Sequence, residues 1–477
     1  MQTIENQRAG GGVLGGRPPE ANTGTPRAAA SNLALVVICL GYFMVIVDTT
    51  VVNVALPAIG RDTHGGVAGL QWVVDAYTLA FAGLLLTGGA LAERLGGRRV
   101  FTAGLVIFGL ASAACGLAPS LALLIAARVA AGVGAALLVP SSLVLLQAAY
   151  PTRAGRARAF GAWGAIAGIG AASGPIVGGL LVTGWSWRGV FFLNLPFAVA
   201  ALALAGRAVP ATGPRPRAVD LPGQVLGVAA LGLLTWALVE AGQAGWASPL
   251  VLGGFGLSAT AWAAFAWAEH RAADPMLPLR LFTRPAFRAG SAVGLLINLG
   301  FYGQLFLMSL YFQDVRGYSA LATGLALLPE AALLIVASAA SGRIMARTGP
   351  RTPMLAGLLL GGAGLVSLVV AGSHSAYPWL ILPMAAAGFG MALTMPAATA
   401  SVIEAAPANR GGIASGVVNA ARQSGGVLGV ALLGALVQAR SAFIPGLHIG
   451  VIIAGGAFLL AAAITFCGVP RAPLTTD

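Results

Sequence analysis

The sequence predicts an all-α protein that crosses a membrane many times. Of its 477 residues, 58% are hydrophobic and only 9% are charged. Apolar runs of about 18 residues or more, long enough to cross a bilayer as a helix, recur along the whole chain. No segment between these runs is long enough to form a separate soluble domain.

Fourteen spans are expected from these runs, and residues 1–32 and 471–477 are expected to form tails, the first of them disordered. The spans are placed near residues 33–57, 70–91, 99–118, 121–147, 158–182, 188–206, 223–243, 250–269, 286–312, 320–345, 351–372, 376–400, 412–437 and 446–469. An even number of spans returns the chain to the side on which it began. No apolar signal core precedes Leu33, so a cleaved signal peptide is not expected.

The 27 basic residues, all of them arginine, indicate how the chain is oriented. If the amino-terminal tail is cytoplasmic, about 21 arginines lie on the cytoplasmic side, in agreement with the positive-inside rule. The exceptions are Arg61, Arg188, Arg316 and Arg440 outside, and Arg128 and Arg422 within spans. The net charge of +13 therefore reports topology and not nucleic-acid binding, and both termini are expected in the cytoplasm.

Two internal sequence repeats predict that the chain consists of two related halves. Residues 132–140 resemble residues 388–396, and residues 89–96 resemble residues 342–349 more weakly. Each pair is separated by about 255 residues and keeps its orientation across the membrane, as parallel repeats do. We therefore expect six-helix halves at 33–206 and 286–470, with two extra spans in a linker at 207–285.

Asp48 lies well inside the first span. A carboxylate at such a depth costs about 3 kcal/mol on insertion scales, which makes it a candidate functional group. Arg128 lies at a similar depth in the fourth span, and a nearby cation favours the ionised carboxylate. Asp48 and Arg128 are the predicted proton-coupling pair. The alternative is a structural ion pair that only orients helices.

Two further motifs stand out. The loop between the second and third spans combines a carboxylate, several arginines and glycines at set spacings, and it is expected to lock the cytoplasmic helix ends together. Its residues are Gly89, Glu93, Arg94, Gly96, Arg98 and Arg99. The alternative is that the loop carries only the positive charge expected on the cytoplasmic side.

The fifth span is unusually rich in glycine, which in a membrane lets helices approach closely. The residues of this motif are Gly161, Gly170, Gly174, Pro175, Gly178 and Gly179. A generic helix-dimerisation face would explain only Gly170 and Gly174.

Polar residues in other spans are candidates for a substrate cavity. They are Asp75, Asn298, Tyr302, Gln304, Glu330, Asn419, Arg422 and Gln423. Glu330 and Asp75 would attract lipophilic cations, which aromatic faces also bind. Hydrogen bonding between helices is the alternative role for the amides.

These motifs together resemble those of the fourteen-span drug–proton antiporters of the major facilitator superfamily. The glycine string is similar to the antiporter motif of the fifth helix, and residues 48–57 resemble the first-helix motif. Residues 89–99 resemble the cytoplasmic signature, with Glu93 where the family usually has Asp, and Arg128 matches a fourth-helix arginine implicated in proton transfer. The resemblance covers residues 33–469 and implies two six-helix bundles with two extra central helices.

The resemblance implies a proton-driven antiporter that exports hydrophobic or amphipathic compounds across the bacterial cytoplasmic membrane by alternating access. An exporter of one small metabolite, or a proton-coupled importer, is the alternative. No enzyme is expected, because the sequence has neither His-Glu-x-x-His nor Gly-x-Ser-x-Gly. Three scattered cysteines and four distant histidines indicate no metal site. The expected partners are protons, hydrophobic or cationic small molecules and the bilayer, with the proton gradient in place of a cofactor.

Overall fold

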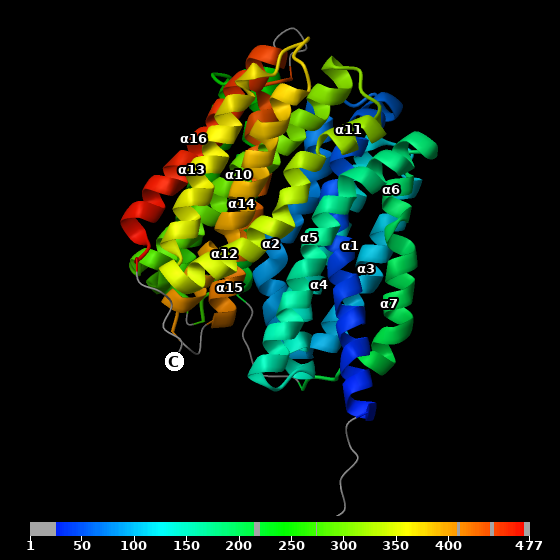
Figure 1. The fold of residues 1–477 in the computed structure, drawn as a ribbon, viewed down its shortest axis with the longest axis vertical. Coiled ribbons are helices and arrows are strands. Elements are labelled where there is room, and N and C mark those ends of the chain that lie inside the picture. Colours follow the sequence, from blue (N-terminus) through cyan, green and yellow to red (C-terminus); the bar gives the residue numbers. More distant parts are fainter. Residues whose placement is uncertain (1–24, 214–219, 273, 408–410, 439–442, 472–477) are drawn as a thin grey trace, which may run out of the picture.

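The computed structural model describes residues 25–213, 220–272, 274–407, 411–438 and 443–471, and its regular secondary structure within those ranges is helical (Figure 1). The predicted tails, apart from residues 25–32 and 471, and Arg440 lie outside the described residues. The helices of the first half are α1 (Thr25–Thr63), α2 (Val67–Leu95), α3 (Gly97–Leu117), α4 (Leu121–Ala149), α5 (Arg153–Gly184), α6 (Gly189–Phe192) and α7 (Asn194–Ala208).

Two helices follow in the predicted linker, α8 (Leu221–Ala244) and α9 (Pro249–Arg271). The remaining elements are η1 (Leu279–Thr283), α10 (Pro285–Leu310), the π-helix η2 (Tyr311–Val315), α11 (Ala320–Ala326), α12 (Leu328–Thr348), α13 (Arg351–Ser367), η3 (Leu368–Val370), α14 (Pro378–Ala405), α15 (Gly411–Ala435) and α16 (Phe443–Gly468).

Thirteen helical segments of the described chain are long and apolar enough to cross a membrane. The fourteenth predicted span, 412–437, corresponds to α15, a helix of 25 residues. It is not among the thirteen. Its polar or charged residues include Asn419, Arg422 and Gln423, and the helix packs against α10 and α2.

The predicted spans 320–345 and 188–206 correspond to the candidate membrane spans Leu328–Thr348 and Gly189–Ala208, and each predicted range contains one interruption of the helix. The first is broken at Leu327, between α11 and α12, and the second at Leu193, between α6 and α7. Pro329 and Pro196 follow the two breaks. Both prolines lie in the first turn of the helix that follows the break, where a missing N–H costs no intrahelical hydrogen bond.

The helices pack as two groups. In the first, α2 and α3 pack on α4, and α1 packs on α5 and α7. In the second, α10 packs on α15 and α16, and α14 packs on α12 and α13. The extra helices α8 and α9 pack on each other, and α8 also lies against α2 of the first group and α15 of the second.

Two glutamines connect α8 to both groups. Gln224, near the start of α8, donates from Nε2 to the carbonyl of Gly83 on α2. Gln438 lies just after α15, and its Nε2 donates to the carbonyl of Val239 on α8 at 2.9 Å and to Oε1 of Gln71 on α2 at 3.0 Å. These bonds join α8 to α2 at one end and to the α15 terminus at the other.

The two ends of the bundle differ in how the groups meet. We call the end where α1 begins the lower end, and the end that carries α6 and α11 the upper end (Figure 1). At the upper end α11 packs against α5, so the two groups touch. Towards the lower end α12 and α15 diverge from α4 and α5 in the view of Figure 1.

Candidate functional site

Asp48 of α1 and Arg128 of α4 form an ion pair inside the first group of helices. Arg128 Nη1 donates to Asp48 Oδ2, and both side chains are 1% exposed. The two residues are 80 positions apart in sequence, and the packing of α1 against α4 brings them together. This burial isolates the pair from bulk water.

Other helices complete the surroundings of this pair. Arg128 Nε donates to the carbonyl of Val73 at 2.9 Å, and its guanidinium lies 4.2 Å from the ring centre of Tyr77, both on α2. Asn194 on α7 donates from Nδ2 to Asp48 Oδ1 at 3.3 Å and to Ser112 Oγ on α3 at 3.3 Å. Five helices, α1, α2, α3, α4 and α7, thereby contribute to one arrangement around the Asp48 carboxylate and its arginine.

Sequence reasoning did not find three of these residues: Tyr77, Ser112 and Asn194. Asn194 had a usable signal, since it is an amide within the otherwise apolar run Phe191–Pro196. Tyr77 and Ser112 had none, because one tyrosine or serine in an apolar helix does not indicate which neighbour it meets.

The glycines of α5 make a surface against α1. Gly170 faces Ile46 and Phe43, and a methyl group added to it would lie 3.1 Å from Ile46 Cγ2. A methyl group on Gly174 would collide with Thr50 Oγ1, and one on Gly178 would lie 3.0 Å from the Val51 carbonyl. Gly161 is different, because no atom lies within 4 Å of where its methyl group would be.

The upper part of the same helix meets the second group. A methyl group on Gly179 would lie 2.7 Å from Leu321 Cα on α11. Conversely, a methyl group on Gly324 of α11 would collide with the carbonyl of Pro175. Glycine on both sides therefore permits backbone contact between α5 and α11, and this contact helps close the upper end.

A second upper contact arises from a proline in α1. Pro57 lies inside α1 and lacks the N–H that would normally bond to the carbonyl of Asn53. Ser309 of α10 donates its hydroxyl to that carbonyl at 2.6 Å. Gln313, in the π-helix η2 that continues α10, donates from Nε2 to the adjacent carbonyl of Val54 at 3.0 Å. The second group thus provides a hydrogen-bond donor for an α1 carbonyl that has no donor within its own helix.

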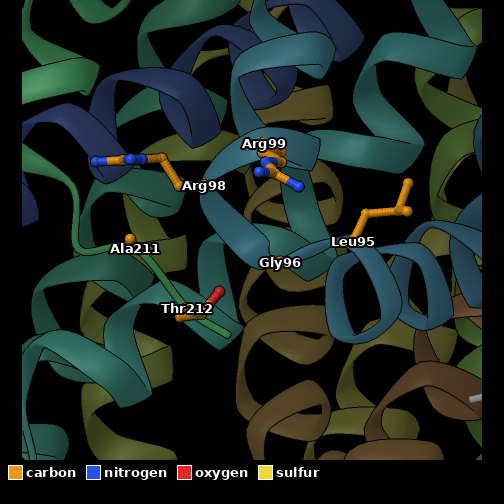
Figure 2. Close-up of a pocket in the computed structure, with 6 residues that line it drawn as sticks. All are labelled: Leu95, Gly96, Arg98, Arg99, Ala211 and Thr212. Carbon is orange, nitrogen blue, oxygen red and sulfur yellow. The ribbon is translucent and has the colours of Figure 1, made fainter. Parts of the chain in front are cut away.

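The signature residues at the turn between α2 and α3 lie at the lower end. Gly96 has φ +93°, and a side chain there would also meet the Thr212 carbonyl. The Gly97 N–H donates to Thr212 Oγ1 at 2.6 Å. Figure 2 shows this turn beside the chain that follows α7, where a pocket of about 190 Å³ is lined by Leu95, Gly96, Arg98, Arg99, Ala211 and Thr212.

Contacts of Arg98 and Gly89 at this turn lie within the first group. Arg98 Nη1 donates to the carbonyl of Gly206 at the end of α7, at 3.5 Å. Glu93 lines a neighbouring pocket of about 590 Å³ together with Arg156 at the start of α5. Gly89 faces Pro140 of α4, at 3.6 Å from its added methyl group, and Arg94 is exposed. The predicted lock between the halves stays a prediction.

The predicted cavity residues divide into separate clusters. Gln304 of α10 donates to Glu330 Oε2 on α12 at 3.4 Å, and Glu330 Oε1 has no hydrogen-bond partner among the residues described. Asp75 of α2 is fully buried, and neither carboxylate oxygen has a hydrogen-bond partner in the part of the chain described. Asn298 donates to the Gly294 carbonyl of its own helix at 2.7 Å.

The remaining cavity candidates lie closer to the boundary between the groups. Arg422 Nη1 donates to Asn419 Oδ1 at 3.3 Å on the same face of α15. Tyr302 of α10 lies 3.4 Å from the position of a methyl group on Gly426 of α15. Tyr302, Arg422 and Gln423 are all half-buried. No group of three or more His, Cys, Asp or Glu residues that could bind a metal occurs among the described residues.

Comparison with known proteins places these features in context. The sequence profile described as Major Facilitator Superfamily matches residues 38–430. The chain is 37% identical over 446 residues to the methylenomycin A resistance protein of Streptomyces coelicolor, covering 94% of each chain. It is 40% identical over 408 residues to the multidrug resistance protein Stp of Mycobacterium tuberculosis, covering 85% of this chain and 76% of that protein.

A third relative is the puromycin resistance protein pur8 of Streptomyces alboniger, at 40% identity over 84% of this chain and 80% of that one. Among solved structures, an autoinhibited POT family peptide transporter superposes with a TM-score of 0.69 at 16% identity, covering 92% of this chain and 96% of the other. At that identity the likeness shows a shared fold alone.

Proposed function

The chain belongs to the major facilitator superfamily, and on that premise we propose that it is a proton-driven antiporter that exports hydrophobic or amphipathic drugs and antibiotics. As a member of this family it is a multi-pass membrane transporter and not an enzyme. Relatives named for resistance to methylenomycin A and puromycin support the export of antibiotics. In this proposal the lower end faces the cytoplasm of a bacterial cell, with both termini there.

The buried pair of Asp48 and Arg128 is the observation that carries the proton coupling. A proton that binds Asp48 removes the negative charge that compensates Arg128, so the two side chains no longer hold each other. Arg128 keeps its bond to the Val73 carbonyl and its contact with Tyr77. Protonation therefore releases α1 from α4, while Arg128 of α4 keeps its contacts with α2.

Helix α1 connects this pair to the upper closure. Five residues after Asp48, the Asn53 carbonyl accepts the bond from Ser309, and Val54 accepts the bond from Gln313. The glycine face of α5 holds α1 along the intervening turn, at Thr50 and Val51. A shift of α1 on protonation would loosen these upper contacts, which is the step that alternating access requires.

The energy available from one proton is sufficient for export. A proton that crosses a potential of about 150 mV releases roughly 3.5 kcal/mol. That energy supports a gradient of a few hundredfold for a neutral solute. No larger driving force is needed to keep a toxic compound at a low cytoplasmic concentration.

The direction of transport tests the proposal. We expect inside-out vesicles that contain the protein to accumulate an amphipathic fluorescent antibiotic when the lumen is acidified, and to lose that accumulation on addition of a protonophore. Vesicles without the protein give the background. Accumulation by right-side-out vesicles in response to an acidic exterior would instead identify an importer.

A further inference from the structure

Arg422 is a charged residue in the middle of α15 that has no ion-pair partner in the part of the chain that is described, where the ion pairs are Asp48–Arg128 and Asp62–Arg188. Its Nη1 donates to Asn419 one turn away, and its buried Nε has no hydrogen-bond partner among the described residues. Burial of a guanidinium within a membrane span costs about 3 kcal/mol on insertion scales, so such residues usually mark a transport path.

The surroundings of Arg422 are aromatic and come from both groups of helices. Its Cγ lies 3.3 Å from a methyl group placed on Gly294 of α10, and Tyr302 of α10 faces Gly426 one turn further along α15. Tyr42 on α1 lies within electrostatic range of Arg422. Tyr42 in turn stacks on Trp163 of α5, with ring centres 3.7 Å apart and an angle of 6° between the planes.

These four side chains, Tyr42, Trp163, Tyr302 and Arg422, are all half-buried, so part of each is accessible. The nearby part of α5 towards the lower end is open, because no atom lies within 4 Å of a methyl group on Gly161 or Gly164. A planar compound that enters from the lower end would meet aromatic faces and a guanidinium whose Nε is uncommitted.

We infer that Arg422 binds the anionic group of planar aromatic substrates, and that Tyr42, Trp163 and Tyr302 hold the rings. A guanidinium offers several N–H donors in one plane, which suits a carboxylate, and the charged bonds are strong. Aromatic side chains add stacking with the substrate ring. This inference rests on the proposed export function and specifies one class of its substrates.

The site differs from the one predicted for cations. Glu330 bonds to Gln304, and neither Glu330 nor Asp75 forms an ion pair with an arginine within the described ranges. Two sites of opposite charge in one path would allow the protein to accept acids and bases through different contacts. A purely structural role would instead have Arg422 pair with Asp75 or Glu330 in another conformation.

Binding of two matched probes separates these possibilities. 1-Pyrenecarboxylate and 1-pyrenemethylammonium share one ring system and carry opposite charges. Purified protein in nanodiscs is titrated with each probe, energy transfer from tryptophan to pyrene reports binding, and empty nanodiscs correct for partition into lipid. The variants are Arg422→Gln, Arg422→Lys and the control Arg347→Gln, an exposed arginine at the lower end of α12.

We expect Arg422→Gln to weaken binding of the carboxylate by about tenfold or more, the scale of a lost charged hydrogen bond, with less than about a twofold change for the cation. Arg422→Lys should recover part of the loss, and Arg347→Gln should leave both affinities unchanged. Equal loss for both probes, no loss for either, or failure of the wild-type protein to bind the carboxylate would overturn the inference.

The proposed function is tested separately in vesicles with the wild-type protein. If neither probe nor any other amphipathic compound accumulates in response to a proton gradient, the export proposal fails. The binding result for Arg422 then still stands or falls on its own measurement.

Discussion

At the scale of single residues, the arrangement around Asp48 explains why so polar a cluster is tolerated inside a membrane protein. The charge of Asp48 is matched by Arg128, and the second oxygen accepts a bond from Asn194. Removal of one partner from such a buried ion pair lowers the stability of the protein, because the remaining charge is left without compensation. The cluster is therefore stable in the paired state and sensitive to the addition of one proton.

We predict that Arg128→Ala lowers the thermal unfolding temperature of the detergent-solubilised protein far more than Arg188→Ala. Removal of one partner of a buried pair costs about 3–5 kcal/mol, whereas exposed pairs contribute about 0–1 kcal/mol. Arg188 pairs with Asp62 at 2.7 Å, but the two side chains are 35% and 47% exposed. Similar shifts for the two variants would contradict the account of the buried pair.

Asp48 and Arg128 could be predicted from the sequence because each is a charged residue within an apolar run. A charge at such a position costs free energy and therefore indicates a function. Their contacts with Asn194, Tyr77 and Ser112 were not predictable, since these neighbours come from three other helices. Periodicity shows which face of a helix a residue occupies but does not show which helix packs on that face.

At the scale of helices, α1 is the element that several contacts share. It carries Asp48, it supplies the surface for the glycines of α5, and its carbonyls near Pro57 bond to the second group. Proline and glycine, which weaken helices in water, here create the contacts between helices.

We predict that Gly174→Leu abolishes transport without preventing membrane insertion, because its side chain would collide with Thr50 and the α1 backbone at Val51. Gly161→Leu is the matched control on the same helix, since open space surrounds Gly161. Transport in vesicles and the amount of protein in the membrane are measured for both. Full transport by Gly174→Leu would show that close packing of α1 on α5 is dispensable.

We also predict that the double variant Ser309→Ala, Gln313→Ala shifts the protein towards a state open at the upper end. The variant leaves the Asn53 and Val54 carbonyls without donors from α10. Spin labels on α6 and α11 would report a longer distance at the upper end. Ser258→Ala, which removes a 2.8 Å bond between α9 and α8, is the control and should leave the distance unchanged. An unchanged distance in the double variant would rule out this closure.

The breaks at Leu193 and Leu327 show a limit of prediction at this scale. Pro57, Pro140, Pro175 and Pro396 all lie inside continuous helices, whereas Pro196 and Pro329 follow breaks. A proline inside a helix leaves a carbonyl free. At Asn53 the Ser309 hydroxyl satisfies that carbonyl, and a local sequence pattern cannot show such a neighbour from a distant segment.

At the scale of the whole molecule, the apolar runs and the two repeats were enough to predict an all-α membrane protein with two helical halves. The major facilitator type was predicted from the resemblance of its motifs. The relation of α8 and α9 to the rest could not be predicted, because no repeat contains them. In the structure α8 bonds to α2 through Gln224 and to the end of α15 through Gln438.

We predict that an alkaline phosphatase fusion at Gly245, in the turn between α8 and α9, is active, and that fusions at Gly213 and after Thr476 are silent. The enzyme works only outside the cytoplasm, so this pattern follows if α8 and α9 both cross the membrane with the lower end in the cytoplasm. A silent fusion at Gly245 would reduce the count to twelve spans. Expression of each fusion is checked by immunoblot.

The most direct test of the central claim is proton movement coupled to substrate movement in liposomes that contain the purified protein and an internal pH dye. Addition of a transported compound to the wild-type protein should produce a pH change in proportion to the compound moved. Asp48→Asn should abolish that change while it retains substrate binding, and Asp62→Asn, which alters the exposed pair with Arg188, should behave as wild type. Proton movement that persists in Asp48→Asn would contradict the account.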